Sequence, residues 1–272
     1  MDIFTHMLTR NDCYISGSPI TPCGVMVHST GANNPRLSRY VDDPRFGRPS
    51  PRHWNQSGVG ACVHAFIGKT SDGSVETVQT LPWNMMGWHS GSGTLGYAQN
   101  ANHSGYIGFE ICEDDLSDPT YFAAVYREAV ELVAYLCRIY HLDPLAPGVV
   151  ICHSEGHRLG IASNHADVMH WFPRFGESMD TFRAAVAAEL RAPEKKEDNE
   201  MTEKEIREIV RSELEKISRE QAAEPASSWA QPLIDEAAAL GITDGSRPMS
   251  PCTRQEAIVL ALKAAQTGRE GE

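Results

Sequence analysis

The sequence predicts an α/β domain built on one central mixed β-sheet flanked by helices, followed by a small all-α C-terminal segment. Two observations carry this prediction. Short apolar runs typical of strands alternate with stretches of helical periodicity over residues 1–191, an order that favours one mixed sheet covered by helices. Beyond a charged linker at residues 192–201, only helical patterns remain. We therefore expect a spacer helix at residues 202–224 and a compact segment at residues 225–272.

The first predicted strands lie before residue 80. Residues 24–28 form a short apolar run, and residues 60–67 and 74–78 form two more, joined by a turn at residues 69–73. The last two are expected to pair as a hairpin. Between the first and second runs, residues 29–51 form a long polar loop. A loop of this length in a compact domain is usually functional, so we expect it to line a cleft for a polar ligand.

The second half of the predicted domain adds two strands and two helices. Residues 81–105 are rich in Trp, Asn, Gly and His and are expected to form ordered loops around the cleft. A strand at residues 106–112 follows, with one glutamate inside an apolar run. Asp118 as N-cap and Pro119 in the first turn open a helix that runs to about residue 139. A strand at residues 149–153 and a closing helix at residues 177–190 complete the domain.

Composition excludes several function classes. The formal net charge of −12 would repel nucleic acid and anionic lipid, so no nucleic-acid partner is expected. The seven cysteines are odd in number and form no CxxC pair, a pattern typical of a reducing cytoplasm. No signal peptide and no membrane span are expected, because the N-terminus lacks a basic start followed by an apolar stretch.

The candidate chemistry centres on histidines that close strands. His28 and His153 each end an apolar run, and a loop containing two glycines then brings His165 and Asp167 back to the same neighbourhood. Two imidazoles and one carboxylate are typical of a hydrolytic zinc centre with an open coordination position. Asp167 is flanked by His165 and His170, and spacing alone does not choose which of them provides the third ligand.

Four motifs resemble the type-2 N-acetylmuramoyl-L-alanine amidase family, which shares its fold with peptidoglycan recognition proteins and T7 lysozyme. The resemblance covers about residues 20–180. This part of the chain is closely similar in its motifs to the amidase domains of phage endolysins from Gram-positive hosts. It implies a zinc ion bound by His28, His153 and Asp167. The motifs are His28-Ser-Thr, Tyr106-Ile-Gly-Phe-Glu110, Cys152-His153-Ser-Glu-Gly-His and Asn164-His-Ala-Asp167.

The resemblance also implies catalytic roles. Glu110 matches the family's strand glutamate and is expected to act first as general base and then as acid. His165 stands where the family often has a lysine, and as a cation or N–H donor it is expected to stabilise the oxyanion. Some members carry a catalytic tyrosine at the position of Val63. Valine cannot do that work, so more of the proton transfer is expected to fall to Glu110.

Three residues are predicted to bind substrate. Trp88 and His89 resemble the family's Gly-Trp-His cleft segment, although Trp88 in the core is an equally good interpretation. Asn33 lies on the long polar loop. His64 is expected to be a packed strand histidine.

The C-terminal segment resembles a single S-layer homology-type repeat, through residues 228–230, 234–237, 241–248 and 251–258. That family binds secondary cell-wall polymers, commonly with several repeats acting together, so a second wall contact is expected here. The spacer helix at residues 202–222 carries a stripe of Ile206, Val210, Leu214 and Ile217. This stripe permits a homo-oligomer, whereas a solvated spacer explains it equally well. Met201 at the end of the linker is a candidate start for a shorter wall-binding product.

Together these features predict zinc-dependent hydrolysis of the amide bond between N-acetylmuramic acid and L-alanine in bacterial peptidoglycan. The favoured context is a bacteriolytic phage endolysin, made in the host cytoplasm and acting on the cell wall after release. Two alternatives stay open, namely a non-catalytic peptidoglycan-binding protein on the same fold and a bacterial recycling or autolytic amidase. The presence of Asp167 favours the enzyme, because binding proteins of this kind lack a complete ligand set.

Overall fold

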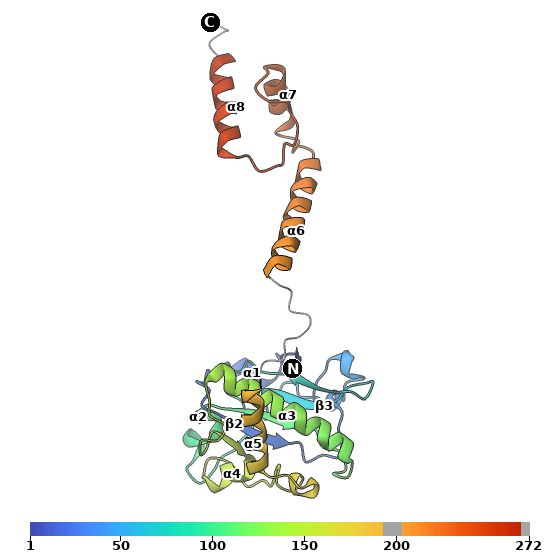
Figure 1. The fold of residues 1–272 in the computed structure, drawn as a ribbon, viewed down its shortest axis with the longest axis vertical. Helices are drawn as coiled ribbons and strands as arrows, with labels where there is room; N and C mark the ends of the chain where they lie inside the picture. The colour runs from blue at the N-terminus through green and yellow to red at the C-terminus, as the bar shows by residue number, and fades with distance from the viewer. Residues whose placement is uncertain (193–202, 268–272) are drawn as a thin grey trace. The chain divides into compact units, whose positions relative to one another are not determined.

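A six-stranded mixed sheet with strand order β1-β4-β3-β5-β2-β6 forms the centre of the N-terminal unit. The computed structural model describes residues 1–192 and 203–267, and the chain divides into two units, Met1–Glu194 and Lys195–Glu272. The predicted α/β class is confirmed, with helices against the sheet (Figure 1). The strands are β1 (Ile3–Thr5), β2 (Gly24–Ser29), β3 (Ala65–Lys69), β4 (Val75–Gln79), β5 (Tyr106–Ile111) and β6 (Val150–Cys152).

One antiparallel hairpin interrupts an otherwise parallel sheet. β3 and β4 pair antiparallel, as the turn between them predicts, and Gly73 adopts φ +91° within that turn. The other pairs are parallel, with β2 between β5 and β6. Strand β1, which the sequence did not lead us to expect, adds a parallel edge beside β4. All six residues of β2 are buried, as a strand covered on both faces requires.

Two long helices cover one face of the sheet. Helices α3 (Pro119–Tyr140) and α5 (Met179–Arg191) lie side by side there (Figure 1). Asp118 caps α3 by accepting the N–H groups of Thr120 and Tyr121, and Ser178 caps α5 by accepting that of Thr181. Alternate residues of the central strands point into this main core, which includes Val25, Val27, Ile107, Phe109, Val133 and Phe182.

The opposite face of the sheet carries polar side chains among short elements. Since successive residues of a strand point to opposite faces, Met26 and His28 face away from the main core that holds Val25 and Val27. Helix α4 (His153–Arg158) packs closely against this face, because a Cβ on Gly156 would lie 2.7 Å from Cε of Met26. The remaining short elements are α1 (Asp12–Ser16), α2 (Ala101–Ser104), η1 (Leu37–Arg39), η2 (Pro44–Phe46), η3 (Tyr97–Gln99) and η4 (Phe172–Phe175).

The long polar loop at residues 29–51 is partly a structural cover. It contains η1 and η2, and four of its apolar side chains are buried against Phe66 of β3. Tyr40 stacks on Phe66 with ring centroids 4.9 Å apart. This part of the loop therefore encloses a second core instead of opening into a cleft. The four buried side chains are Leu37, Tyr40, Val41 and Phe46.

The C-terminal unit is helical in the part that the structure describes. It contains α6 (Glu203–Ala223), α7 (Gln231–Ala239) and α8 (Arg254–Thr267). The predicted linker lies outside the described residues apart from residue 192, as does Met201. Among the helices described, none is both long and apolar enough to cross a membrane.

Candidate metal centre

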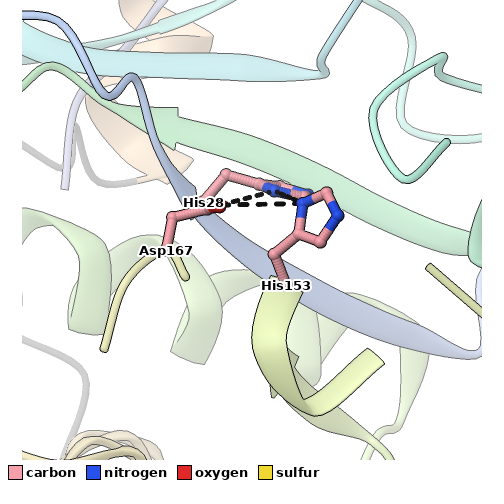
Figure 2. A group of neighbouring side chains, drawn as sticks. All are labelled: His28, His153 and Asp167. Carbon is pink, nitrogen blue, oxygen red and sulfur yellow. Dashed lines mark hydrogen bonds and ion pairs between the residues drawn. The ribbon is translucent and has the colours of Figure 1, made fainter. Parts of the chain in front are cut away.

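Three side chains converge on the polar face of the sheet from three separate elements. His28 projects from β2, His153 is the first residue of α4, and Asp167 lies on the loop that follows (Figure 2). One ligand atom from each lies within 4.8 Å of the others. This is the set that the family resemblance implies, so the structure brings the predicted ligands together.

The separations between the ligand atoms match one face of a zinc tetrahedron. His28 Nδ1 lies 3.0 Å from His153 Nδ1 and 3.1 Å from Oδ2 of Asp167. The remaining edge, from His153 Nδ1 to Asp167 Oδ2, is 3.7 Å. Zinc–ligand bonds of about 2.0–2.1 Å in a tetrahedron place the ligand atoms about 3.3 Å apart. The donor set and its spacing therefore fit a zinc ion with one position open to solvent or substrate.

Sheet register explains why the two histidines meet. In the parallel pair of β2 and β6, Val27 is the partner of Cys152. His28 on β2 and His153, the first residue after β6, therefore stand at the same level near the carboxyl ends of the two strands. Asp167 reaches them because the chain reverses after α4 through Gly160, which has φ +79°. The Ser154 N–H then donates to the Asp167 carbonyl at 3.3 Å.

The electrostatics of the cluster prepare it for a cation. Burial alone would raise the pKa of Asp167, but the neighbouring His28 and His153 hold it below its ordinary value. Burial and the neighbouring His28 lower the pKa of His153 to about 4. At neutral pH the site thus presents a carboxylate and a neutral imidazole, the forms that bind zinc.

Glu110 stands beside the metal cluster on the adjacent strand. It is the register partner of His28 in the parallel pair of β5 and β2, and its Oε2 is buried with no hydrogen-bond partner among the described residues. Burial, Asp167 and Glu113 together raise its pKa well above the ordinary value. A desolvated carboxyl with a free oxygen suits proton transfer near neutral pH.

These groups share one open cleft of about 700 Å³. His165 is exposed at its mouth, with its ring 4.6 Å from that of His153 and its Nδ1 3.0 Å from Oγ of Ser163. The lining residues include all three candidate ligands, both predicted catalytic residues and both residues of the Trp88-His89 pair.

The predicted substrate contacts divide between the cleft and its surroundings. Trp88 lines the cleft, and its Nε1 is buried without a partner in the described part of the chain. His89 also lines the cleft, but both of its ring nitrogens are engaged within the protein. Asn33 is exposed and lies two residues beyond Gly31, the last cleft residue of that loop. Substrate binding by these three residues stays a prediction.

The structure adds two residues that sequence reasoning did not single out. Glu113 is only 4% exposed and lines the cleft, with its Oε1 2.9 Å from Nε2 of His170. Ser163 Oγ lies 3.2 Å from Nε2 of His153. The signal for Glu113 was its position just after the strand that carries Glu110. Ser163 left no signal in the sequence, because its role depends on a turn that only the folded chain defines.

The comparisons with known proteins agree with this site. Residues 18–170 match the family model described as N-acetylmuramoyl-L-alanine amidase. The chain belongs to this amidase family. The match includes every candidate ligand and both predicted catalytic residues, so membership carries the family's activity as a peptidoglycan amidase onto this chain. It ends before the C-terminal unit.

Solved structures are similar to this chain at low sequence identity. A hydrolase of Staphylococcus aureus, AmiA, has 17% identity and a TM-score of 0.50, with 70% of this chain and 83% of that chain covered. A mutant endolysin from Bacillus subtilis has 20% identity and a TM-score of 0.47, with 68% and 99% covered. No curated protein matches the chain. The fold is therefore shared with AmiA, whereas details of function must come from the residues of this chain.

Proposed function

We propose that this amidase is zinc-dependent and cleaves the bond between the lactyl group of N-acetylmuramic acid and L-alanine in bacterial peptidoglycan. The observation that carries the proposal is the convergence of His28, His153 and Asp167 at zinc-ligand spacing beside the unpartnered carboxyl of Glu110. A binding protein on this fold would have no need of a complete ligand set or of a desolvated acid next to it.

His28 Nδ1, His153 Nδ1 and a carboxylate oxygen of Asp167 would hold the ion. When bound, zinc supplies a Lewis acid that polarises the amide carbonyl and lowers the pKa of water. Glu110 takes a proton at its carboxylate from the attacking water as the oxygen bonds to the carbonyl carbon. It then gives that proton to the nitrogen of the leaving L-alanine as the C–N bond breaks. Its raised pKa matches both directions of transfer.

His165 supports the developing negative charge from the solvent side of the cleft. Its exposed ring packs on His153, so it lies beside a ligand and not within the ligand triangle. An N–H aimed at the oxyanion stabilises the tetrahedral state more than the planar amide, which is the condition for catalysis. In this proposal it replaces the lysine that the family often has.

We also propose that the protein is a phage endolysin acting on the wall after release, with the C-terminal unit as a second wall contact. The resemblance of residues 228–258 to an S-layer homology-type repeat supports a secondary cell-wall polymer as its ligand. Gly245, with φ +73°, packs near Ile234 of α7. The turn between α7 and α8 is therefore folded against α7. A short repeat of this kind gains strength from valency.

Self-association through α6 would supply that valency. Its apolar side chains Ile206, Val210, Leu214 and Ile217 are between 47% and 61% exposed, and they recur at the spacing of one helix face. Sedimentation of the full chain tests this proposal. We expect the wild type to be an oligomer and the double variant Val210→Glu, Leu214→Glu to be a monomer. A monomeric wild type would contradict the proposal and identify α6 as a solvated spacer helix.

Mass analysis of peptidoglycan digested by the purified protein with zinc tests the reaction. We expect stem peptides with free L-alanine amino termini, separated from intact glycan strands that carry free lactyl carboxyl groups, and glycan or cross-bridge cleavage would contradict the proposal. Asp167→Ala should abolish both bound zinc and lysis. If the wild type binds the wall without cutting it, the protein is a binding module. If it cuts soluble muropeptides far better than intact wall, it is a recycling amidase.

A further inference from the structure

The imidazole of His89 lies beside the metal cluster and packs against two glycines. A Cβ on Gly108 of β5 would lie 2.5 Å from Cγ of His89, and one on Gly87 would lie 2.8 Å from its Cδ2. The backbone N–H groups of His89 and Ser90 both donate to Oδ1 of Asn102, each at 3.1 Å. Ring and backbone are therefore held in one orientation.

The ring of His89 connects the metal cluster to a backbone carbonyl. Its Nε2 lies 3.1 Å from the carbonyl oxygen of Tyr106, and its Nδ1 lies 3.0 Å from Nε2 of His28. A carbonyl oxygen only accepts hydrogen bonds, so Nε2 of His89 carries a proton. In the neutral ring Nδ1 is then an acceptor, and Nε2 of His28 must be the donor. In a neutral His28 this leaves the lone pair at Nδ1, facing His153 and Asp167.

Without the hydrogen-bonded connection from His28 through His89 to the Tyr106 carbonyl, the metal cluster would favour the other tautomer of His28. The Asp167 carboxylate lies 3.1 Å from His28 Nδ1, and a carboxylate is a strong acceptor that would draw the proton to that nitrogen. A proton on Nδ1 blocks the position from which a metal is bound. The Tyr106 carbonyl, acting through His89, opposes the pull of Asp167.

The second histidine ligand has a parallel arrangement. Ser163 Oγ lies 3.2 Å from Nε2 of His153 and donates its own proton to the Ser90 carbonyl at 3.2 Å. It therefore accepts from His153 Nε2, which again leaves the lone pair on Nδ1. Both connections depend on one segment, because His89 and Ser90 are adjacent and are anchored together by Asn102.

We infer that His89 is a positioning residue, which fixes the tautomer of His28 so that the Nδ1 lone pair is ready for the metal before the metal arrives. Ser163 does the same for His153. The inference rests on the proposed zinc site and deepens it. It gives His89 a role behind the ligands, where partners of ligating histidines commonly change metal affinity by about 10- to 100-fold.

Three substitutions in the full chain separate this role from simple packing. His89→Leu removes the acceptor, whereas His89→Asn places a carbonyl oxygen close to the position of Nδ1 and keeps it. His103→Leu is the matched control, because His103 is exposed and its ring nitrogen bonds only to Asn100 among the described residues. Zinc affinity is measured for each by competition with a chromophoric chelator, together with a circular-dichroism melt.

We expect zinc to bind at least tenfold more weakly to His89→Leu, and within about threefold of wild type to His89→Asn and His103→Leu. Ser163→Ala should weaken binding in the same direction as His89→Leu. Equal zinc affinity in wild type and folded His89→Leu would overturn the inference. Weakening by the same factor in His89→Asn would also overturn it, since that outcome points to packing.

A measurement on the unsubstituted protein keeps the test open if the variants do not fold. Nitrogen-15 correlation spectra of the metal-free wild type report which ring nitrogen of His28 carries the proton. We expect the Nε2–H tautomer, and an Nδ1–H tautomer or an equal mixture would overturn the inference. None of these readouts uses peptidoglycan. A protein that binds zinc with the expected tautomer but cuts no wall would contradict the proposed function and leave this inference standing.

Discussion

His28 and Glu110 are register partners on the neighbouring parallel strands β2 and β5. Partners at one level of a sheet point to the same face, so the backbone hydrogen bonds of the sheet set the position of the candidate base relative to the metal ligand. Neither side chain depends on a loop for its placement. Sites built on strands hold their geometry more tightly than sites built on loops, and this pair provides the rigid half of the cleft. Asp167 and His165 lie on the loop after α4 and provide the other half.

Replacing Glu110 by glutamine should separate chemistry from metal binding. Glutamine keeps the size of the side chain and removes its ability to move a proton, so hydrolysis should fall by about 10²- to 10⁴-fold. Zinc content should stay at the wild-type value. Turbidity loss of purified walls and bound zinc by elemental analysis measure the two quantities. Glu131→Gln on α3 is the control and should leave both unchanged, and wild-type lysis by Glu110→Gln would remove Glu110 from the mechanism.

The acid limb of the pH profile should depend on Glu113. Burial, followed by the charges of Asp167 and Glu113, raises the pKa of Glu110. A base must be deprotonated, so kcat/KM should fall as the pH drops through this raised pKa. In Glu113→Gln one of the repelling charges is gone, which lowers the pKa of Glu110 and should move the acid limb to lower pH. An acid limb that stays in place, or that moves to higher pH, would contradict the assignment of that limb to Glu110.

Zinc should stabilise the folded protein through His153. A ligand that binds only the folded state adds about 2.7 kcal/mol at a free concentration one hundred times its Kd, so Tm should rise with zinc in the wild type. His153→Ala should lose this rise in Tm, because the two remaining ligands are too few to hold the zinc ion. His157→Ala, one turn further along α4, should keep it. A rise of equal size in His153→Ala would show that the stabilising zinc binds elsewhere.

The sheet and the ligands could be predicted because their signals are local. The hairpin β3–β4 follows from its turn residues, and α3 follows from the Asp118 cap and the Pro119 that comes after it. His28 and His153 each follow an apolar run, and parallel strands bring their carboxyl ends to one edge. The choice of Asp167 over its neighbouring histidines came from the family resemblance, and the structure agrees by placing only its carboxylate in the ligand cluster.

The features that could not be predicted depend on contacts distant in sequence. Strand β1 has three residues, too few to show a period. The link from His28 to His89 spans 61 residues and needs the close packing that Gly108 allows, so no pattern along the chain reveals it. The polar loop at residues 29–51 was expected to line a cleft, yet the ring of its Tyr40 stacks on Phe66. Local polarity of the loop did not show which side chains turn inward.

Substitutions of His165 should show whether its charge matters. His165→Ala should reduce kcat by about 10²-fold, the cost of one oxyanion donor, and leave zinc binding within a few-fold of wild type. His165→Lys should recover most of the rate, because a lysine ammonium stays charged to high pH. Rates for His165→Lys as low as those for His165→Ala would instead assign His165 a steric role.

His64 should make the protein sensitive to mild acid. It is fully buried, its Nε2 donates to the Met85 carbonyl at 2.7 Å, and burial lowers its pKa from 6.5 to about 4. In the unfolded chain the imidazole binds a proton below pH 6.5, whereas the folded protein resists protonation until about pH 4. The contribution of His64 to stability is therefore complete above pH 6.5 and is lost as the pH falls towards 4.

The size of that loss is about 3 kcal/mol, from a pKa difference of some 2.5 units. His64→Gln keeps a donor for the Met85 carbonyl and has no proton to bind. Urea unfolding of both proteins at pH 7 and pH 4.5, with a chelator present, gives the difference in pH dependence. Every other titrating group is present in both proteins, so its contribution cancels in the difference between their pH dependences. The variant should be less stable than wild type at pH 7 and should lose less stability between the two pH values. An equal loss in both proteins would mean that His64 titrates normally and is not sealed from water.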